Sequence, residues 1–199
     1  MKTGVLGGTF NPVHLGHVRM SRKIMEAKGF DRMIFIPSNI PPHKQEEKIP
    51  SPAKRIKMLK LALEDEKDFI IDGYEVRKKG ISYSIDTIRY LKKKYEDDEL
   101  YWIIGADMLF QIEKWHDFKN VLREMSFIAV KREGYDKRDI EAYAAELRGK
   151  YGADISFCEM EPIDISSTDI RGKVKRGEEI KKLVHKKVER YIIDNKLYK

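Results

Sequence analysis

The sequence predicts an α/β protein in which a parallel, Rossmann-like sheet is flanked by helices. Short apolar runs alternate with segments whose apolar residues recur at helical spacing, and this alternation is typical of βαβ units. Hydrophobic residues make up 41% of 199 residues, enough for a core. No internal repeat, low-complexity tract or Gly/Ser linker divides the chain, so we expect a single domain over residues 1–199.

The composition argues against several classes of protein. No apolar run approaches the roughly 20 residues of a membrane span, so no membrane partner is expected. The single cysteine, Cys158, excludes an intramolecular disulfide and a Cys-based zinc site. Together with a strand near the start and no signal peptide, this predicts a cytoplasmic protein. Lys and Arg number 40 against 33 Asp and Glu, a net charge of +7, which we interpret as a solvated basic surface that helps to steer anionic nucleotides.

The first strand and the first turn organise the rest of the chain. The apolar pair Val5-Leu6 predicts a strand, which runs into the stretch Gly7 to His17, GGTFNPVHLGH. Gly7 and Gly8 lack a Cβ, so a ligand can approach the backbone closely there. The dipeptide Asn11-Pro12 is a turn signal. The pattern therefore predicts a strand, a glycine turn and a helix start within twenty residues.

Two histidines stand at the entry of that helix. His14 and His17 are three residues apart and so share one helix face. The helix N-terminus below them offers unpaired N–H groups and a partial positive charge, which suit an anion. A metal pair is the alternative, but no third ligand or cysteine cluster accompanies them, and we expect no protein-bound metal. The combination predicts a site for a nucleoside triphosphate.

The next elements follow from apolar spacing and proline positions. A helix is predicted over Leu15 to Lys28, with its buried stripe at Met20, Ile24 and Ala27. The run Met33 to Ile36 is apolar throughout and predicts a strand buried on both faces. Prolines make 37–52 a loop. Arg55 opens the following helix, where it is either a phosphate contact or a solvated residue, and the stripe there is Ile56, Leu59 and Leu63.

The middle of the chain repeats the same alternation. Residues 69–71 and 101–104 predict strands, and Ser84 is a plausible N-cap for a helix that buries Ile85, Ile88 and Leu91. Gly105 and Asp107 follow the second of these strands. The carboxyl end of a parallel strand is where such sheets bind ligands, so we expect these two residues at the site, although Asp107 also suits a helix cap.

The last third adds two strands and three helices. Strands are predicted at 127–130 and 155–157, an amphipathic helix lies between them, and a tail helix turns Ile180, Val184, Val188 and Ile192 inward. Between the last strand and the tail lies Ile165 to Arg171, ISSTDIR. Three hydroxyl residues before a helix are ordinary capping chemistry, and they also form a second helix N-terminus able to bind an anion.

Two of these motifs resemble a known family. His14-Leu15-Gly16-His17 resembles the H-x-G-H signature of the nucleotidyltransferase superfamily, and the longer GGTFNPVHLGH is similar to that of the nicotinate-nucleotide adenylyltransferases. The run Ile165 to Arg171 matches the I-S-S-T-x-I-R of the superfamily. The resemblance extends in order from Gly7 to Arg171 and implies the nucleotidyltransferase fold.

The resemblance implies an activity and an ATP site. AMP would pass from ATP to nicotinate mononucleotide, giving deamido-NAD and pyrophosphate in NAD biosynthesis, with Mg²⁺ arriving on ATP. The implied catalytic residues are His14, His17, Lys44 and Arg171. The implied ATP-binding residues are Gly8, Thr9, Phe10, Gly16, Gly105, Asp107, Arg132, Ser166, Ser167 and Thr168.

The resemblance also implies an acceptor site. The segment Ser82-Tyr83-Ser84 is similar to the family's Ser-Tyr-Thr, with serine where threonine is usual, and the family places an aromatic ring at Trp115 against the nicotinate. The implied residues that bind nicotinate mononucleotide are Lys44, Arg55, Tyr83, Ser84, Asp107 and Trp115. A homo-oligomer is compatible with the sequence, which does not define an oligomeric state.

Three other classes of protein are alternative interpretations of this sequence. Pantetheine-phosphate adenylyltransferase shares similar motifs but typically has threonine at the position of His14, and it lacks a counterpart of the segment from Gly105 to Trp115. Class I aminoacyl-tRNA synthetases need more chain for a tRNA-binding body. A basic nucleic-acid-binding protein should interleave aromatic and basic residues on one surface, whereas the motifs here fall at strand ends, so no nucleic-acid partner is expected.

Overall fold

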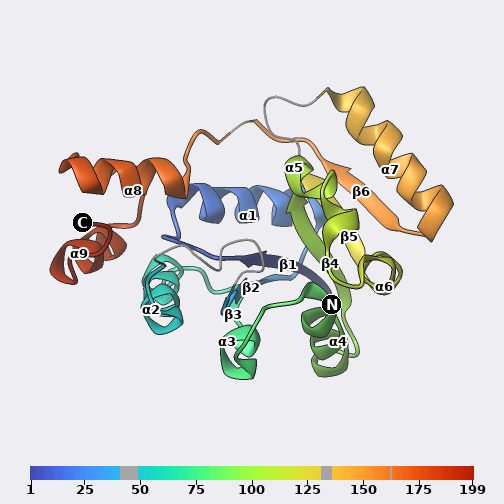
Figure 1. Cartoon of the computed structure of the whole chain (residues 1–199), viewed down its shortest axis with the longest axis horizontal. Helices are drawn as coiled ribbons and strands as arrows, with labels where there is room; N and C mark the ends of the chain where they lie inside the picture. Colours follow the sequence, from blue (N-terminus) through green and yellow to red (C-terminus); the bar gives the residue numbers. More distant parts are fainter. Residues whose placement is uncertain (41–48, 131–135, 162) are drawn as a thin grey trace.

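A computed structural model of the chain describes residues 1–40, 49–130, 136–161 and 163–199. Its centre is a six-stranded sheet in the order β3-β2-β1-β4-β5-β6, and every neighbouring pair is parallel (Figure 1). The strands are β1 Lys2–Gly8, β2 Arg32–Pro37, β3 Phe69–Ile71, β4 Glu99–Gly105, β5 Ser126–Val130 and β6 Asp154–Cys158. The predicted parallel α/β class and all six predicted strands are confirmed.

Helices cover both faces of the sheet (Figure 1). They are α1 Leu15–Lys28, α2 Pro52–Ala62, α3 Tyr74–Lys78, α4 Ser84–Lys94, α5 Ala106–Leu109, the 3-10 turn η1 Ile112–Lys114, α6 Phe118–Glu124, α7 Lys137–Tyr151, α8 Ser167–Arg176 and α9 Lys186–Asp194. Successive strand residues point to opposite faces. Val5 therefore packs with α4, α6 and α7 in one core, while Leu6 packs with α1, α2 and α9 in the other.

The predicted helices are confirmed with local corrections. In α1, Ile24 is buried, but Val18 and Ser21 complete the stripe, whereas Met20 is half-buried and Ala27 is exposed. The prediction of Ala27 as a core residue was wrong because the row Val18, Ser21, Ile24 drifts around the helix by about 60° at each step of three, so the next position, Ala27, faces away from the side that Val18 buries. The helix ends as expected at Gly29, whose φ of 63° is left-handed.

Two helix starts also differ from the prediction. Tyr83, not Ser84, is the N-cap of α4, and its side chain makes no capping hydrogen bond. The tail helix begins only at Lys186, after His185 as N-cap. Ile180 and Val184 are buried as predicted, but they lie in turns before that helix. The short elements α3, α5, η1 and α6 have no counterpart in the prediction, because helices this short carry little periodic signal.

Candidate active site

A cavity of about 660 Å³ opens at the carboxyl ends of β1 and β4. The chain leaves β1 toward β2 on one side, and β4 lies on the other, so the order of the sheet reverses between these two strands. Ligands of open α/β sheets bind at such a switch point. One part of the lining comes from the first turn, and the opposite part comes from α4 and the segment after β4, with the residues Gly7, Gly8, Thr9, His17, Tyr83, Ser84, Gly105, Trp115 and His116.

The glycine turn is required by packing as well as by access. A Cβ on Gly7 would lie 2.9 Å from the Trp102 ring, and one on Gly8 would lie 3.2 Å from the ring of Phe10. Phe10 itself has a left-handed φ of 47° and is buried, so its side chain supports the turn and does not line the cavity. Its ring meets His17 edge-on, with centroids 5.2 Å apart.

The two histidines lie against each other, with ring centroids 3.7 Å apart. The backbone N–H of His14 donates to Nδ1 of His17 at 3.2 Å. A neutral ring whose Nδ1 accepts carries its proton on Nε2, and His17 lines the cavity. His17 thus offers an N–H donor at the helix start, while His14 is buried beside it.

Gly16 explains why the signature has a glycine between its histidines. A Cβ there would lie 2.8 Å from Nδ1 of His14 and 3.3 Å from Ile163. Any side chain would displace the His14 ring, because contacts shorter than 3.0 Å force something to shift. The glycine therefore permits the stacked pair of histidines.

Hydrogen bonds connect the start of α8 to the loop after β1. Ser166 is the N-cap and accepts from the Asp169 N–H at 3.1 Å, while the Ser167 hydroxyl donates to the Pro12 carbonyl at 2.9 Å. Arg171 Nη1 donates to the Asn11 carbonyl at 3.0 Å, and its Nη2 contacts the Thr168 hydroxyl at 3.3 Å. The structure thus brings together the two helix starts that were predicted to bind an anion, although none of these α8 residues lines the cavity itself.

Arg55 was predicted to be either a phosphate contact or a solvated residue, and the structure excludes the solvated alternative. Its side chain is 1% exposed, and it donates to carbonyls at 2.6 to 3.1 Å, those of Ser38, Asn39, Thr9 and Pro50. Burial lowers the pKa of this guanidinium, and the nearby Tyr198 and Glu75 oppose that shift. Arg55 holds the ends of β1 and β2 in register and lies behind the cavity wall.

Among the described residues, the segment after β4 has two buried polar atoms without a hydrogen-bond partner. Gly105 lines the cavity and caps α5. In the next turn, Oδ1 of Asp107 is buried without a hydrogen bond, and so is Nε1 of Trp115. Buried polar groups in folded proteins are normally paired. These two atoms are therefore candidates for contact with a ligand.

Tyr83 and His116 form an aromatic pair at the other side of the cavity, with ring centroids 4.3 Å apart. Trp115 and Ser84 also line this part. The predicted Tyr83, Ser84 and Trp115 are therefore brought together. Lys44 and Arg132 lie outside the described residues, so their predicted roles stay predictions.

Sequence reasoning missed several residues that line the cavity. They include Met20, Ser38, Glu75, Ser82, Met108, Gln111, Lys114 and His116. Glu75 belongs to the unpredicted helix α3, and it is buried. Only Ser82 and His116 carried a signal, because each neighbours a residue that the resemblance singled out.

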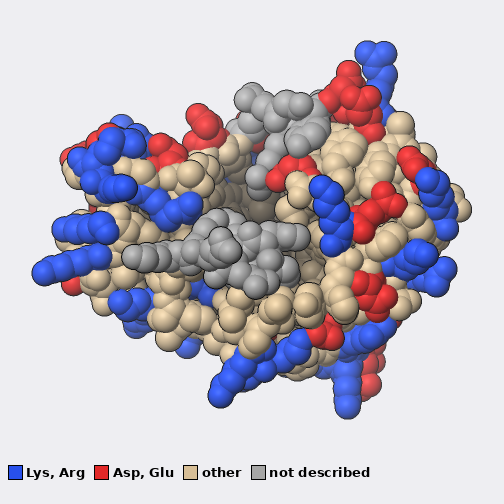
Figure 2. All heavy atoms as spheres, viewed as in Figure 1, with Lys and Arg blue, Asp and Glu red and all other residues tan. Residues whose placement is uncertain are grey.

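The positive charge is unevenly distributed along the chain. From Arg171 to Lys199 there are eleven Lys or Arg and four Asp or Glu, a surplus that equals the net charge of the whole chain. Figure 2 shows these basic side chains gathered over α8 and α9. A field of this sign on one side of the molecule attracts anionic nucleotides.

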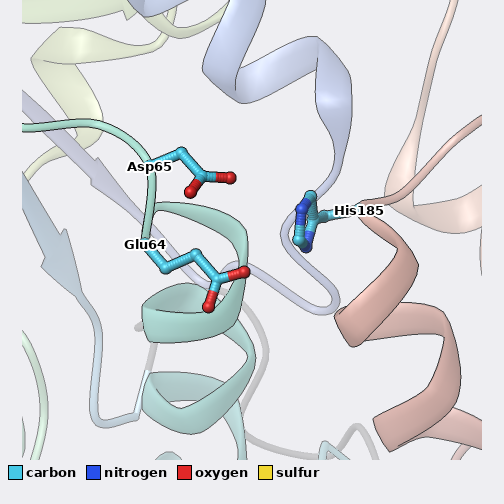
Figure 3. Close-up of side chains that lie close together, drawn as sticks. All are labelled: Glu64, Asp65 and His185. Carbon is cyan, nitrogen blue, oxygen red and sulfur yellow. The ribbon is translucent and has the colours of Figure 1, made fainter.

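One group of side chains could hold a cation among the described residues, and it lies away from the cavity. Glu64 and Asp65 follow α2, and His185 precedes α9 (Figure 3). Glu64 is already ion-paired with Lys187 at 2.5 Å, and Nδ1 of His185 accepts the Lys187 N–H at 3.4 Å. We interpret this group as a contact between α2 and α9. Within the described ranges no helix has the length and apolar character to cross a membrane.

The fold and the switch-point cavity define a nucleotide-binding α/β protein, and comparison narrows the class. Residues 5–173 match the family model described as cytidylyltransferase-like. A relative from Clostridium acetobutylicum is 40% identical over 99% of this chain and 98% of its own. Another, from Caldicellulosiruptor saccharolyticus, is 40% identical over the full length of both chains. Both are named "Probable nicotinate-nucleotide adenylyltransferase".

The chain therefore belongs to the cytidylyltransferase-like family and, within it, to the nicotinate-nucleotide adenylyltransferases. A solved structure of the Plasmodium falciparum nicotinic acid mononucleotide adenylyltransferase complexed with NaAD has a TM-score of 0.81, covering 99% of this chain and 97% of that one. At 17% sequence identity this likeness speaks for the fold alone.

Proposed function

We propose that the protein transfers the adenylyl group of ATP to nicotinate mononucleotide, releasing pyrophosphate and forming deamido-NAD. The observation that carries this proposal is the single continuous cavity at the switch point. Its lining contains a glycine turn and a histidine in one part, and an aromatic wall at a helix start in another part. One space thus offers a phosphate site beside a site for a flat ring, as the joining of two nucleotides requires.

The reaction needs positioning more than proton transfer. The 5′-phosphate of the acceptor is ionised near pH 7, so its oxygen attacks the α-phosphorus without a general base, and the bond to pyrophosphate breaks in line. His17 lines the cavity, and its imidazole would stabilise charge that develops on the phosphoryl oxygens. His14 holds the backbone geometry that fixes the His17 ring.

The triphosphate would lie along the two helix starts. Gly8 and Thr9 give close backbone approach, and Gly105 and Asp107 would contact the adenosine side. Arg171 and the first turn of α8 carry the positive charge that a leaving pyrophosphate needs. Ser167 is already bound to Pro12, so we assign phosphate contact here to the α8 N–H groups and Thr168. Lys44 and Arg132 are proposed as further phosphate contacts from their motif positions.

A magnesium ion fits this arrangement without a protein cage. The carboxylates beside the cavity in the described part of the chain are Glu75, which already accepts from Thr87, and Asp107, whose Oδ1 has no partner. One open carboxylate oxygen suits a largely hydrated ion held by the phosphates. When bound with ATP, the ion supplies charge neutralisation of the phosphate oxygens.

The acceptor ring would lie between Trp115 and the start of α4. The N-cap Tyr83 makes no side-chain hydrogen bond to the helix start, so the first-turn N–H groups remain available to a ligand. These donors favour the carboxylate of nicotinate over the amide of nicotinamide. The expected preference is on the order of 10²–10⁴ in kcat/KM.

The test is pyrophosphate release by the purified protein with ATP and Mg²⁺. The acceptor panel contains nicotinate mononucleotide, nicotinamide mononucleotide and phosphopantetheine. We expect turnover with the first and at least a hundredfold lower kcat/KM with the second. Trp115→Ala should weaken both pyridine acceptors and keep their ratio, since stacking does not sense the carboxylate. Turnover with phosphopantetheine alone would overturn the proposal.

A further inference from the structure

Glu75 is a buried acid that lines the cavity and that the proposed reaction does not use. It belongs to α3, is 7% exposed, and reaches the cavity wall, which Ser38 and Ser82 also line. A buried carboxylate is costly unless it is hydrogen-bonded. The groups around the Glu75 carboxylate therefore indicate its role.

Two hydroxyl groups from either side of the α4 start lie near this carboxylate. The Thr87 hydroxyl, in the first turn of α4 and 1% exposed, donates to Oε1 of Glu75 at 2.7 Å. The Ser82 hydroxyl, just before the N-cap, lies close enough to the same carboxyl to lower its pKa. Between them lie Tyr83 and Ser84, which both line the cavity.

The same network reaches the end of β2. The Asn39 N–H donates to the Ser82 hydroxyl oxygen at 2.9 Å, and the Asn39 side chain donates to the Gly80 carbonyl at 2.9 Å. The Asn39 carbonyl in turn accepts from Arg55 at 3.0 Å. Glu75 therefore binds the first turn of α4 through Thr87, beside the Ser82 hydroxyl that accepts from the β2 end.

The Glu75 carboxylate is held by hydrogen bonding, whereas the nearby positive charges act on it without direct contact. Burial raises the pKa of Glu75, and the hydroxyls of Thr87 and Ser82 and the charges of Lys78 and Arg55 oppose that shift. Lys78 forms its ion pair with Asp86 on the outer side of α4. The Thr87 hydroxyl is thus the group in hydrogen-bond contact with the acid, and the acid sets the direction of that hydroxyl.

From this geometry we propose that Glu75 is a positioning residue for the acceptor site, acting through Ser82 and Thr87 on the first turn of α4. The inference rests on the proposed function, because it assigns the α4 start to the acceptor. Glu75 does not touch the reacting phosphates. Losing it frees the helix start to move relative to β2, which spoils the N–H geometry facing the ring carboxylate while leaving the triphosphate side unchanged.

The experiment measures kcat and both KM values for Glu75→Ala, Glu75→Gln and Thr87→Val. Glu75→Ala should raise the acceptor KM about 10- to 100-fold, the range of a lost hydrogen bond to a charged group, and leave the ATP KM within about threefold. Glu75→Gln keeps an acceptor oxygen for Thr87 and should recover most of this loss. The double variant Glu75→Ala/Thr87→Val should be no worse than Glu75→Ala, because both changes break one contact.

The matched control is Asp86→Asn. It breaks the half-exposed ion pair between Lys78 and Asp86, which joins the same two helices outside the cavity, and it should leave both KM values unchanged. Equal rises in the two KM values for Glu75→Ala, or no recovery in Glu75→Gln, would overturn the inference.

Failure of the inference is distinguishable from failure of the proposed function. The wild-type panel alone tests the acceptor identity. Quenching of tryptophan fluorescence by nicotinate mononucleotide, measured without ATP, reports acceptor binding independently of turnover, since both Trp102 and Trp115 line the cavity. Wild-type quenching that Glu75→Ala leaves unweakened overturns the role of Glu75 and leaves the proposed reaction standing.

Discussion

Replacing Gly16 by alanine tests how the histidine pair works. An alanine Cβ would lie 2.8 Å from Nδ1 and 3.0 Å from Cε1 of His14, so the ring must move by several tenths of an ångström or more. Because the His14 backbone N–H holds Nδ1 of His17, the displacement spreads to the donor that faces the cavity. Misplacement of about 1 Å can cost on the order of 10²-fold in rate. We therefore expect kcat to fall by about 10- to 100-fold.

Stability should change far less than activity in this variant. Alanine is favoured over glycine inside a helix by about 0.5–1 kcal/mol, which offsets part of the steric cost. The control is Gly149→Ala in α7, where a Cβ meets nothing within 4 Å. That change should raise the free energy of unfolding by about 0.5–1 kcal/mol and leave kcat unchanged.

The assay pairs steady-state pyrophosphate release with urea unfolding of both variants. A wild-type kcat in Gly16→Ala would refute the reasoning, since it would mean that the His14 ring can move without consequence. A loss of stability above about 3 kcal/mol would also count against it, because the effect on rate would then be one of folding.

Three further predictions concern single side chains. His17→Asn keeps an acceptor for the His14 N–H but removes Nε2, so kcat should fall about 10²–10³-fold with a melting temperature near that of the wild type. Arg55→Lys cannot serve all the carbonyls that Arg55 binds, and urea unfolding should show a loss of about 2–4 kcal/mol; a loss under 1 kcal/mol would contradict its bracing role. Asp72→Asn should cost roughly 1.5–3 kcal/mol at pH 7, and the difference from wild type should shrink in acid.

The pH dependence in the last case follows from the contacts of Asp72. Burial alone would raise the pKa of this carboxyl, but hydrogen bonds from Lys94, Arg77 and Tyr90 outweigh burial and lower it. The carboxylate therefore adds stability that is fully present above the unfolded pKa of about 3.9. That stability is lost as the pH falls through the lower folded pKa. Urea unfolding at pH 7 and below pH 4 measures the difference, and a pH-independent gap would contradict this account.

Local sequence was sufficient to predict the strands, the main helices and the glycine turn. Residues such as Met33 to Ile36 are apolar throughout, and the two histidines stand three apart at a helix start, so neighbours along the chain carry both signals. The positions of Gly8, His17, Tyr83 and Trp115 around one cavity agree with the prediction, because strand ends in a parallel sheet share one edge. The short helices α3, α5 and α6 were not predicted, because they contain too few turns for a periodic pattern.

Only the tertiary structure shows which groups a side chain binds when its partners lie far away in the sequence. Arg55 reads in the sequence as a helix residue open to solvent or phosphate, yet it is buried against the Thr9 carbonyl 46 positions away. Ser167 reads as a phosphate contact, yet its hydroxyl serves Pro12 at a separation of 155 positions. Glu75 carries no local signal at all. The sequence by itself specifies the alternation of elements and the motif at the first turn, whereas burial and pairing arise from contacts between distant segments, which no local pattern encodes.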